Sequence, residues 1–210
     1  MSKTNNWNDI YSSISNLKKL PWIRTNIPDW FKETINSNWI IPCKTLDVGC
    51  GNGYYSYYLS KKGFNITGID ISKDIIYLAK KNYSHPNLIF KQKDIFSKKI
   101  SKEKYEFILD VGLFHNILPE KREKYSEILS SLLEKNGKVL LFCFDKREHT
   151  FKNKNIYENT LIKIYSYPLS KKEIIKTFKK HFIIQKIKAI SYGTNNYKRR
   201  FICFLKKRDF

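Results

Sequence analysis

The fold of this chain is decided by the stretch Thr45-Leu46-Asp47-Val48-Gly49-Cys50-Gly51-Asn52-Gly53. An apolar run breaks here into three glycines at alternate positions, and a helical pattern follows at once. A second apolar run then ends Gly68-Ile69-Asp70. Strand, glycine-rich turn, helix, strand and acidic residue form half of a nucleotide-binding βαβ unit. Glycine in such a turn adopts positive φ or lets a ligand approach the backbone closely.

The spacing of the glycines indicates which nucleotide this turn would bind. A dinucleotide site uses G-x-G-x-x-G, but this chain has G-x-G-x-G and Tyr54 where the last glycine would stand. Asp47, at the end of the strand, suits a ligand with a positive charge, such as the amino group or sulfonium of S-adenosylmethionine. Asp70 lies 19 residues after Gly51, where a carboxylate accepts both ribose hydroxyls. The alternative is a tight turn that closes an ordinary βα unit.

These residues resemble the cofactor-binding motif of class I S-adenosylmethionine methyltransferases. In that pattern the acidic residue of Lys93-Asp94-Ile95 accepts the adenine amino group and the next apolar residue packs on the ring; a solvated turn aspartate is the alternative. Leu20-Pro21-Trp22, Gly112-Leu113-Phe114-His115 and Leu141-Phe142-Cys143-Phe144-Asp145 extend the resemblance to small bacterial-type enzymes related to thiol and tellurite-resistance methyltransferases. It implies S-adenosylmethionine as cofactor, with contacts from Trp22, Asp47, Gly49, Cys50, Gly51, Asn52, Gly53, Asp70, Ile71, Asp94, Ile95, Asp110 and Leu113.

Length and composition predict one globular domain over residues 1–210, with an N-terminal helical arm over 1–42 and the core over 43–210. The chain is 41% hydrophobic and 15% aromatic, which is typical of a folded protein. No apolar run reaches the ~20 residues of a membrane span, and the first residues lack a signal-peptide core. The four scattered cysteines support neither a metal site nor disulfides, so we expect a reduced, cytoplasmic compartment.

The net charge of +21 has two readings. It could mark a nucleic-acid partner or an anionic membrane. However, 34 of the 40 basic residues are lysine, and the arginine fork that suits phosphate is scarce. Lysine, asparagine, isoleucine, tyrosine and phenylalanine all have A/T-rich codons, so codon bias explains the charge better. We therefore expect a small-molecule acceptor, no membrane, and nucleic acid only as the less favoured partner.

Alternating strand and helix patterns predict an α/β fold. We expect a Rossmann-like, seven-stranded, mostly parallel sheet with an antiparallel last strand, helices on both faces and an N-terminal helical lid. The predicted helices follow the glycine turn or span Ser72–Asn82, Glu120–Glu134 and Ser170–Lys179, with a stop signal at Lys135-Asn136-Gly137. The predicted strands are Thr45–Val48, Asn65–Asp70, Asn87–Lys91, Phe107–Val111, Lys138–Phe144, His181–Ser191 and Arg200–Lys206.

The arm before the first strand is rich in large aromatic residues. Apolar residues from Trp7 to Leu17 have helical spacing, and Pro28 precedes a second helix, Asp29 to Asn36. Because exposed aromatics are costly, we predict that the arm covers the carboxyl ends of the strands, with Trp22 near the sulfonium and His115 opposite. The lysine-rich segment Lys146 to Lys163 is expected to cover the mouth of the pocket.

The end of the fourth strand holds the candidate catalytic residue, His115. Ligands of open α/β sheets bind beyond the carboxyl ends of the strands, and a histidine there could act as a general base or only shape the pocket. The segment lacks both the D/N-P-P-aromatic motif of adenine amino methylation and the Pro-Cys of cytosine C5 methylation.

We therefore expect methyl transfer to a small nucleophile, such as a thiol or another soft atom. An RNA or protein methyltransferase is the main alternative, and a cofactor-binding protein without catalysis is a third. Either a monomer or a homodimer is compatible with the sequence.

Overall fold

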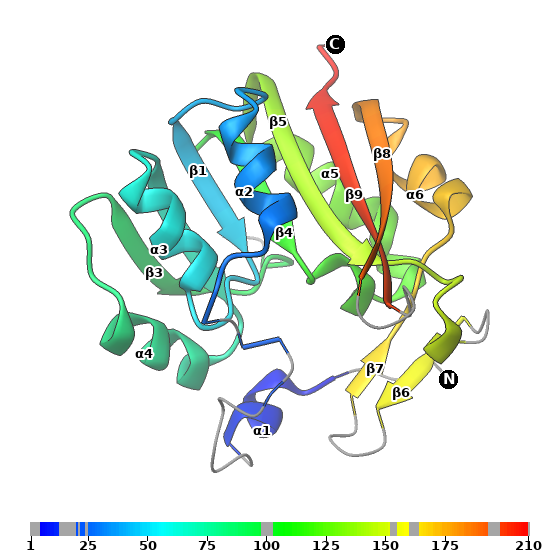
Figure 1. Cartoon of the computed structure of the whole chain (residues 1–210), viewed down its shortest axis with the longest axis horizontal. Coiled ribbons are helices and arrows are strands. Elements are labelled where there is room, and N and C mark those ends of the chain that lie inside the picture. The colour runs from blue at the N-terminus through cyan, green and yellow to red at the C-terminus, as the bar shows by residue number, and fades with distance from the viewer. Residues whose placement is uncertain are drawn as a thin grey trace.

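The computed structural model describes residues 5–12, 20, 22–23, 25–97, 103–151, 155–159, 164–192 and 198–209. Its centre is a seven-stranded sheet of order β3-β2-β1-β4-β5-β9-β8 (Figure 1). All neighbouring strands from β3 to β5 are parallel, whereas β9 is antiparallel to both β5 and β8. The strands are β1 Lys44–Val48, β2 Asn65–Asp70, β3 Leu88–Gln92, β4 Tyr105–Val111, β5 Leu133–Phe144, β8 Phe182–Tyr192 and β9 Lys198–Lys207. The predicted Rossmann-like fold is confirmed.

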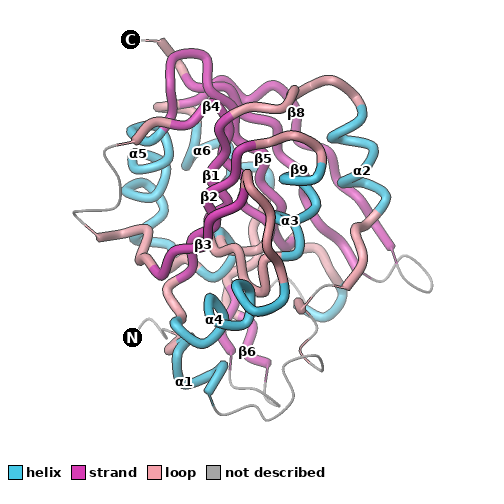
Figure 2. The backbone as a smooth tube through the Cα atoms, turned by 90° about the vertical axis from the view of Figure 1, so that its left-hand side faces the viewer, coloured by secondary structure: helices cyan, strands magenta, loops and turns pink. Residues whose placement is uncertain are grey.

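Helices cover both faces of this sheet (Figure 2). One face packs against α5 and α6, and the other packs against α2 and α3. Side chains alternate along β5, because Leu141 and Cys143 enter the first core and Leu140 and Phe142 the second. The helices are α1 Trp7–Ser12, α2 Asp29–Asn36, α3 Tyr54–Lys61, α4 Lys73–Asn82, α5 Arg122–Leu132 and α6 Lys171–Phe178, with single 3₁₀ turns at η2 Phe114–Asn116, η3 Pro119–Lys121 and η4 His149–Phe151.

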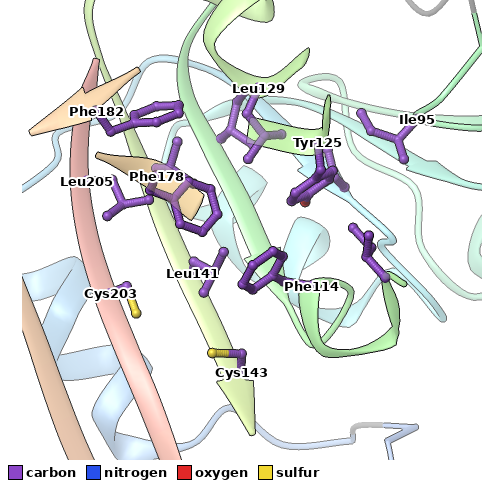
Figure 3. Packing of buried hydrophobic residues seen from close by; sticks show 14 of the residues in the cluster. Ile95, Phe114, Tyr125, Leu129, Leu141, Cys143, Phe178, Phe182, Cys203 and Leu205 are labelled. Atoms are coloured by element: carbon purple, nitrogen blue, oxygen red, sulfur yellow. The ribbon is translucent and has the colours of Figure 1, made fainter. Parts of the chain in front are cut away.

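The first core fixes the loop that follows β4. Phe114 is fully buried and stacks on Tyr125 of α5, with ring centroids 5.8 Å apart (Figure 3). It also contacts Phe178 of α6 at 5.0 Å. His115 directly follows Phe114 in the chain. The packing of Phe114 on Tyr125 and Phe178 therefore holds His115 at the carboxyl edge of the sheet.

Local signals placed most element ends well. Ser72 caps α4 as expected, because its side chain accepts a hydrogen bond from the N–H of Ile75. The long helix differs from its prediction: α5 runs from Arg122 to Leu132 and a 3₁₀ turn precedes it. Asn136 does adopt the left-handed conformation, with φ 62°, but it lies within β5 rather than at the helix end.

The arm before β1 divides into two parts with different roles. α2 is a core helix, because Phe31 is fully buried and Trp30 stacks on Phe142 with centroids 4.7 Å apart. The sequence predicted that the arm covers the carboxyl edge of the sheet. Trp30 and Phe31 instead pack against a face of the sheet. α1 lies at that edge instead and packs on α4. The predicted continuation of its helix to Leu17 falls outside the described residues.

An element that the sequence did not predict lies between β5 and α6. β6, Tyr157–Asn159, and β7, Ile164–Ser166, pair in antiparallel fashion as a separate two-stranded sheet. In Figure 1 this small sheet lies beyond the lower ends of β5 and β9, the edge that also carries α1. Among the helices that the structure describes, none has the length and apolar character needed to cross a membrane.

Candidate active site

The glycine turn after β1 adopts a conformation that ordinary side chains resist. Gly49, Gly51 and Gly53 have φ values of 66°, 54° and 81°, all in the left-handed region. A Cβ built on Gly53 would lie 2.4 Å from Phe90, so that position admits no side chain. A Cβ on Gly51 would meet no atom within 4 Å. Gly51 therefore presents bare backbone to open space, which is where a ligand can approach.

Asp70 ties the ends of two strands together at this turn. Its Oδ2 accepts a hydrogen bond from the N–H of Gly51 at 3.1 Å, and its Oδ1 accepts one from the N–H of Ser72 at 3.0 Å. Burial raises the pKa of this carboxyl above its ordinary value, and hydrogen bonds from the backbone N–H groups of Ser72, Gly51 and Ile71 oppose that shift. Each oxygen keeps a further lone pair that can accept from a ligand hydroxyl.

Asp47 is the second buried carboxyl group of the site, and only 2% of it is exposed. Its Oδ2 accepts a 2.6 Å hydrogen bond from the hydroxyl of Ser56. Burial raises its pKa to about 7 against the effect of Ser56, and the negative charges of Asp110 and Asp70 add to the rise. Neither Asp47 nor Asp70 forms an ion pair with a basic side chain that the structure describes.

These two carboxylates fit the cofactor that the sequence motif implies. A buried carboxylate without a cation is costly, and a bound ammonium or sulfonium group relieves that cost. Asp47 would hold the charged amino-acid end of S-adenosylmethionine, Asp70 would accept its ribose hydroxyls, and Gly51 leaves room for its body. When bound, S-adenosylmethionine supplies an electrophilic methyl group, and the residues named here would hold that methyl group in a fixed position.

A cavity of about 510 Å³ opens at the carboxyl edge of the sheet over these groups. Twelve of the fourteen predicted site residues line it: Trp22, Asp47, Gly49, Cys50, Gly51, Asn52, Asp70, Ile71, Asp94, Ile95, Leu113 and His115. Gly53 and Asp110 were expected to contact the cofactor, but neither lines the cavity. Gly53 instead allows the turn to pack against Phe90.

Asp110 has a supporting role that the sequence motif did not reveal. It is fully buried, and its Oδ2 accepts a 2.7 Å hydrogen bond from the hydroxyl of Tyr125. Its Oδ1 accepts hydrogen bonds from the N–H groups of Leu113 and Phe114. Burial raises its pKa to about 6, against these donors. Through these hydrogen bonds Asp110 fixes the backbone of the loop that carries His115, although Asp110 itself does not line the cavity.

The end of the cavity beside β2 and β3 is partly apolar. Ile71, which follows Asp70, is 42% exposed even though it is a large hydrophobic residue, and Ile95 is buried. Asp94 is exposed, and its Oδ1 accepts a hydrogen bond from the N–H of Phe96 at 2.9 Å. Its other oxygen is available for an adenine amino group lying between the two isoleucines.

His115 lies in the cavity wall as a neutral imidazole. Its ring stacks on Phe144 with centroids 3.6 Å apart, and only 5% of the residue is exposed. Burial lowers its pKa well below the ordinary value, and the charges of Arg200 and Arg122 lower it further. Its Nδ1 has no hydrogen-bond partner among the described residues, so no described carboxylate orients the ring. The predicted catalytic role of His115 remains a prediction.

The N-terminal arm closes one side of the cavity. Trp7, Tyr11 and Trp22 all line it, and the Nε1 of Trp22 donates a 3.0 Å hydrogen bond to the hydroxyl of Tyr11. Asn5 exchanges two 2.8 Å hydrogen bonds with the backbone of Tyr165 in β7. The arm therefore spans the carboxyl edge of the sheet from α4 to β7.

Several lining residues escaped the sequence analysis. They come from the small sheet, the loop after β4 and the start of β9, and include Asn116, Tyr157, Asn159, Ile164, Ser166, Lys198 and Arg200. The sequence analysis expected the segment from Lys146 to Lys163 to cover the mouth of the pocket. This expectation is confirmed in part, because Tyr157 and Asn159 of β6 line the cavity. No group of metal-ligating residues is found in the part of the chain that the structure describes.

Comparisons with known proteins agree with this site. A family profile described as "Methyltransferase domain" matches residues 42–196. An uncharacterised methyltransferase of Schizosaccharomyces pombe is 32% identical over 103 residues, which are 48% of this chain and 71% of that protein. The probable S-adenosyl-L-methionine-dependent methyltransferase TehB of Haemophilus influenzae is 33% identical over 97 residues, 45% of this chain and 32% of TehB.

Among solved structures, a Burkholderia thailandensis enzyme has a similar fold. This 1,6-didemethyltoxoflavin-N1-methyltransferase, with bound 1,6-didemethyltoxoflavin and S-adenosylhomocysteine, has a TM-score of 0.68 at 17% identity, over 84% of this chain and 76% of that chain. The paired carboxylates, the glycine turn and the matched profile lead to one conclusion. The chain belongs to the methyltransferase domain family and is an S-adenosylmethionine-dependent methyltransferase.

Proposed function

We propose that this enzyme transfers the methyl group to a small molecule. The observation that carries the proposal is the aromatic lining of the cavity next to His115. Phe144 and Tyr157 line that part, while Tyr11 and Trp22 of the arm line the other side. Such aromatic walls suit a ligand that is largely buried, as small-molecule sites require. An open groove lined by lysines would have suited RNA or a protein chain.

The proposed roles follow from the contacts described above. Asp47, Asp70, Asp94 and the glycine turn hold the cofactor, and the arm excludes water from the reacting atoms. Attack on a sulfonium methyl group requires mainly positioning in line, so few obligatory catalytic side chains are needed. The Burkholderia enzyme of similar fold is a 1,6-didemethyltoxoflavin-N1-methyltransferase, and its small-molecule acceptor supports the proposal.

A methyl-transfer assay with isotope-labelled S-adenosylmethionine tests the proposal. The panel contains small thiols, phenols, amines and total RNA, and the label is traced to the small-molecule or the macromolecular fraction. We expect label in small molecules only. Label in RNA or in added protein, with none in small molecules, would overturn the proposal and favour the macromolecular alternative.

A further inference from the structure

The carboxylates that line the cavity all lie on one side of β4 along the edge of the sheet. The described carboxylates in the lining, Asp47, Asp70 and Asp94, lie at or just after the ends of β1, β2 and β3. Lys198 and Arg200 lie on β9, on the opposite side of β1 in the strand order. β4, whose following loop carries His115, separates the two groups. Of the other lysines in the lining, Lys93 lies beside Asp94 after β3, and Lys121 lies in η3 after β4. The described carboxylates of the lining thus all lie on one side, which suits the cationic cofactor, and the side of β9 carries only basic charged residues.

The basic half would repel a cationic acceptor. Arg200 is buried, forms an ion pair with Glu148 behind it and packs over Phe144, with its Cζ 4.1 Å from the ring centroid. Lys198 is exposed, and no acidic partner for it is found among the described residues. Because Arg200 is neutralised by Glu148, Lys198 supplies the net positive charge on this side.

The wall of this half is aromatic, because His115, Phe144 and Tyr157 line it. Phe151, which does not line the cavity, stacks on Phe144 at 5.0 Å and meets Tyr157 edge-on at 5.1 Å, so it holds these two rings in place. The neutral polar residues Asn159 and Ser166 complete the lining. A planar ring can lie against such a wall and hydrogen-bond at its edge.

No strong base faces the acceptor from this wall. The ring of His115 is held by stacking on Phe144, and no described carboxylate accepts a hydrogen bond from its Nδ1. The described residues therefore do not form the carboxylate–histidine pair that orients and activates a histidine base. Burial and the positive charges of Arg200 and Arg122 lower the pKa of His115 and so disfavour its protonated form. A nucleophile that still holds its proton would therefore have no good group to receive it.

We propose that the acceptor is a flat aromatic molecule that binds and reacts as its anion, through a thiolate sulfur or an ionised ring oxygen or nitrogen. This inference rests on the proposed small-molecule function. A lone pair of the anion forms the new bond to the methyl carbon. The bond from that carbon to the sulfonium sulfur breaks, and its electron pair stays on the sulfur as a neutral thioether. The negative and positive charges cancel, so no proton remains to be transferred. Because two opposite charges vanish together, the exclusion of water from the reacting atoms favours the reaction.

Binding measurements with three probes of similar size test this inference. Calorimetry of the complex with S-adenosylhomocysteine uses 4-nitrothiophenol (an anion near neutral pH), 4-nitrobenzyl alcohol (neutral) and benzylamine (a cation). We expect 4-nitrothiophenol to bind at least tenfold more tightly than either other probe. Lys198→Glu should weaken its binding about tenfold and leave S-adenosylhomocysteine affinity unchanged. Lys188→Glu, on an exposed site of β8 outside the cavity, is the matched control with no effect.

The pH dependence of methyl transfer provides an independent measurement. With acceptors of different acidity, the midpoint of kcat/KM against pH should follow the acidity of each acceptor, in the wild type and in His115→Asn alike. A midpoint shared by all acceptors and lost in His115→Asn would overturn the inference and make His115 the base. Equal binding and methylation of the alcohol or amine would also overturn it but leave the small-molecule proposal intact. If S-adenosylhomocysteine binds but only RNA or protein is methylated, the proposed function itself fails.

Discussion

The hydroxyl of Ser56 and the carboxylate of Asp47 form a 2.6 Å hydrogen bond in which both side chains are buried. Ser56 lies on α3, directly after the glycine turn, and Asp47 lies on β1 before it. The hydrogen bond favours the ionised carboxylate, whereas burial favours the protonated one. This pair therefore sets how readily the site accepts a cation at neutral pH.

Asp47→Asn should stabilise the protein in the absence of cofactor at pH values above about 7. The pKa of Asp47 is raised from 3.8 to about 7, so its contribution to stability is full below pH 3.8 and is lost as the pH rises to about 7. Each unit of such a shift corresponds to about 1.4 kcal/mol. Asparagine removes the buried charge and still accepts from Ser56. Thermal unfolding at pH 8 and at pH 4 measures the effect, which should vanish at the lower pH; equal gains at both would contradict this origin.

Cofactor affinity should fall as the pH is lowered through about 7. Protonated Asp47 cannot balance a positive charge, so binding should weaken by about tenfold per pH unit below that value. Calorimetry with S-adenosylhomocysteine between pH 5 and 7 measures this. Ser56→Ala removes the hydrogen bond that lowers the pKa of Asp47, and it should move the inflection to higher pH. An inflection that does not move would assign the titration to another group.

Asp70→Ala should weaken cofactor binding by about ten- to a hundredfold. The variant loses the carboxylate predicted to accept both ribose hydroxyls, and charge-assisted hydrogen bonds are among the stronger ones. Asp74→Ala, an exposed site in the first turn of α4 that lies outside the cavity, is the matched control. Unchanged affinity in a folded Asp70→Ala protein would refute the assigned role.

Gly51→Ala should mainly lower cofactor affinity, whereas Gly53→Ala should mainly lower thermal stability. Both positions have positive φ, which costs an alanine roughly 1 kcal/mol. Gly53→Ala adds a clash with Phe90, so its melting temperature should fall further. Gly51→Ala adds no clash within the protein, yet its methyl group would occupy the cavity. We expect Gly51→Ala to lose more cofactor affinity than stability; the reverse order would show that the ligand does not approach Gly51.

Trp22→Ala should lower turnover and cofactor affinity much more than thermal stability. Trp22 lines the cavity, donates a hydrogen bond to Tyr11 and meets Trp7 edge-on at 6.0 Å. Trp39→Ala is the contrasting variant, because Trp39 packs against Phe204 away from the cavity. That control should lose stability but keep its affinity. Early melting of Trp22→Ala with normal specific activity would show that Trp22 is only a packing residue.

The sequence predicted the cofactor half of the site far better than the acceptor half. Asp47, the glycine turn and Asp70 lie within one βαβ unit, so their spacing along the chain reflects their spacing in space. Tyr157 and Arg200 come from segments that only tertiary packing brings beside His115. Asp110 shows a different limit: the motif placed it at the end of the correct strand, but its side chain turns toward Tyr125 in the core.

The arm shows why aromatic content alone does not locate a lid. Trp30 and Trp22 are both large aromatics before β1, yet one stacks on Phe142 in the core and the other lines the cavity. Burial stabilises an aromatic side chain in either place, so aromatic content alone does not distinguish a core residue from a residue that lines the cavity.

The position of β9 has a consequence for synthesis of the protein. β9 is the last strand in the described chain, yet it lies between β5 and β8, with Phe201, Cys203 and Leu205 buried in the first core. A ribosome makes the chain from its N-terminus, so β1 to β5 and the cofactor half can assemble while β9 is still untranslated. The sheet has a gap until residues 198–207 emerge, and Lys198 and Arg200 arrive with them. The side of the cavity that carries Lys198 and Arg200 is therefore completed by the last strand of the described chain.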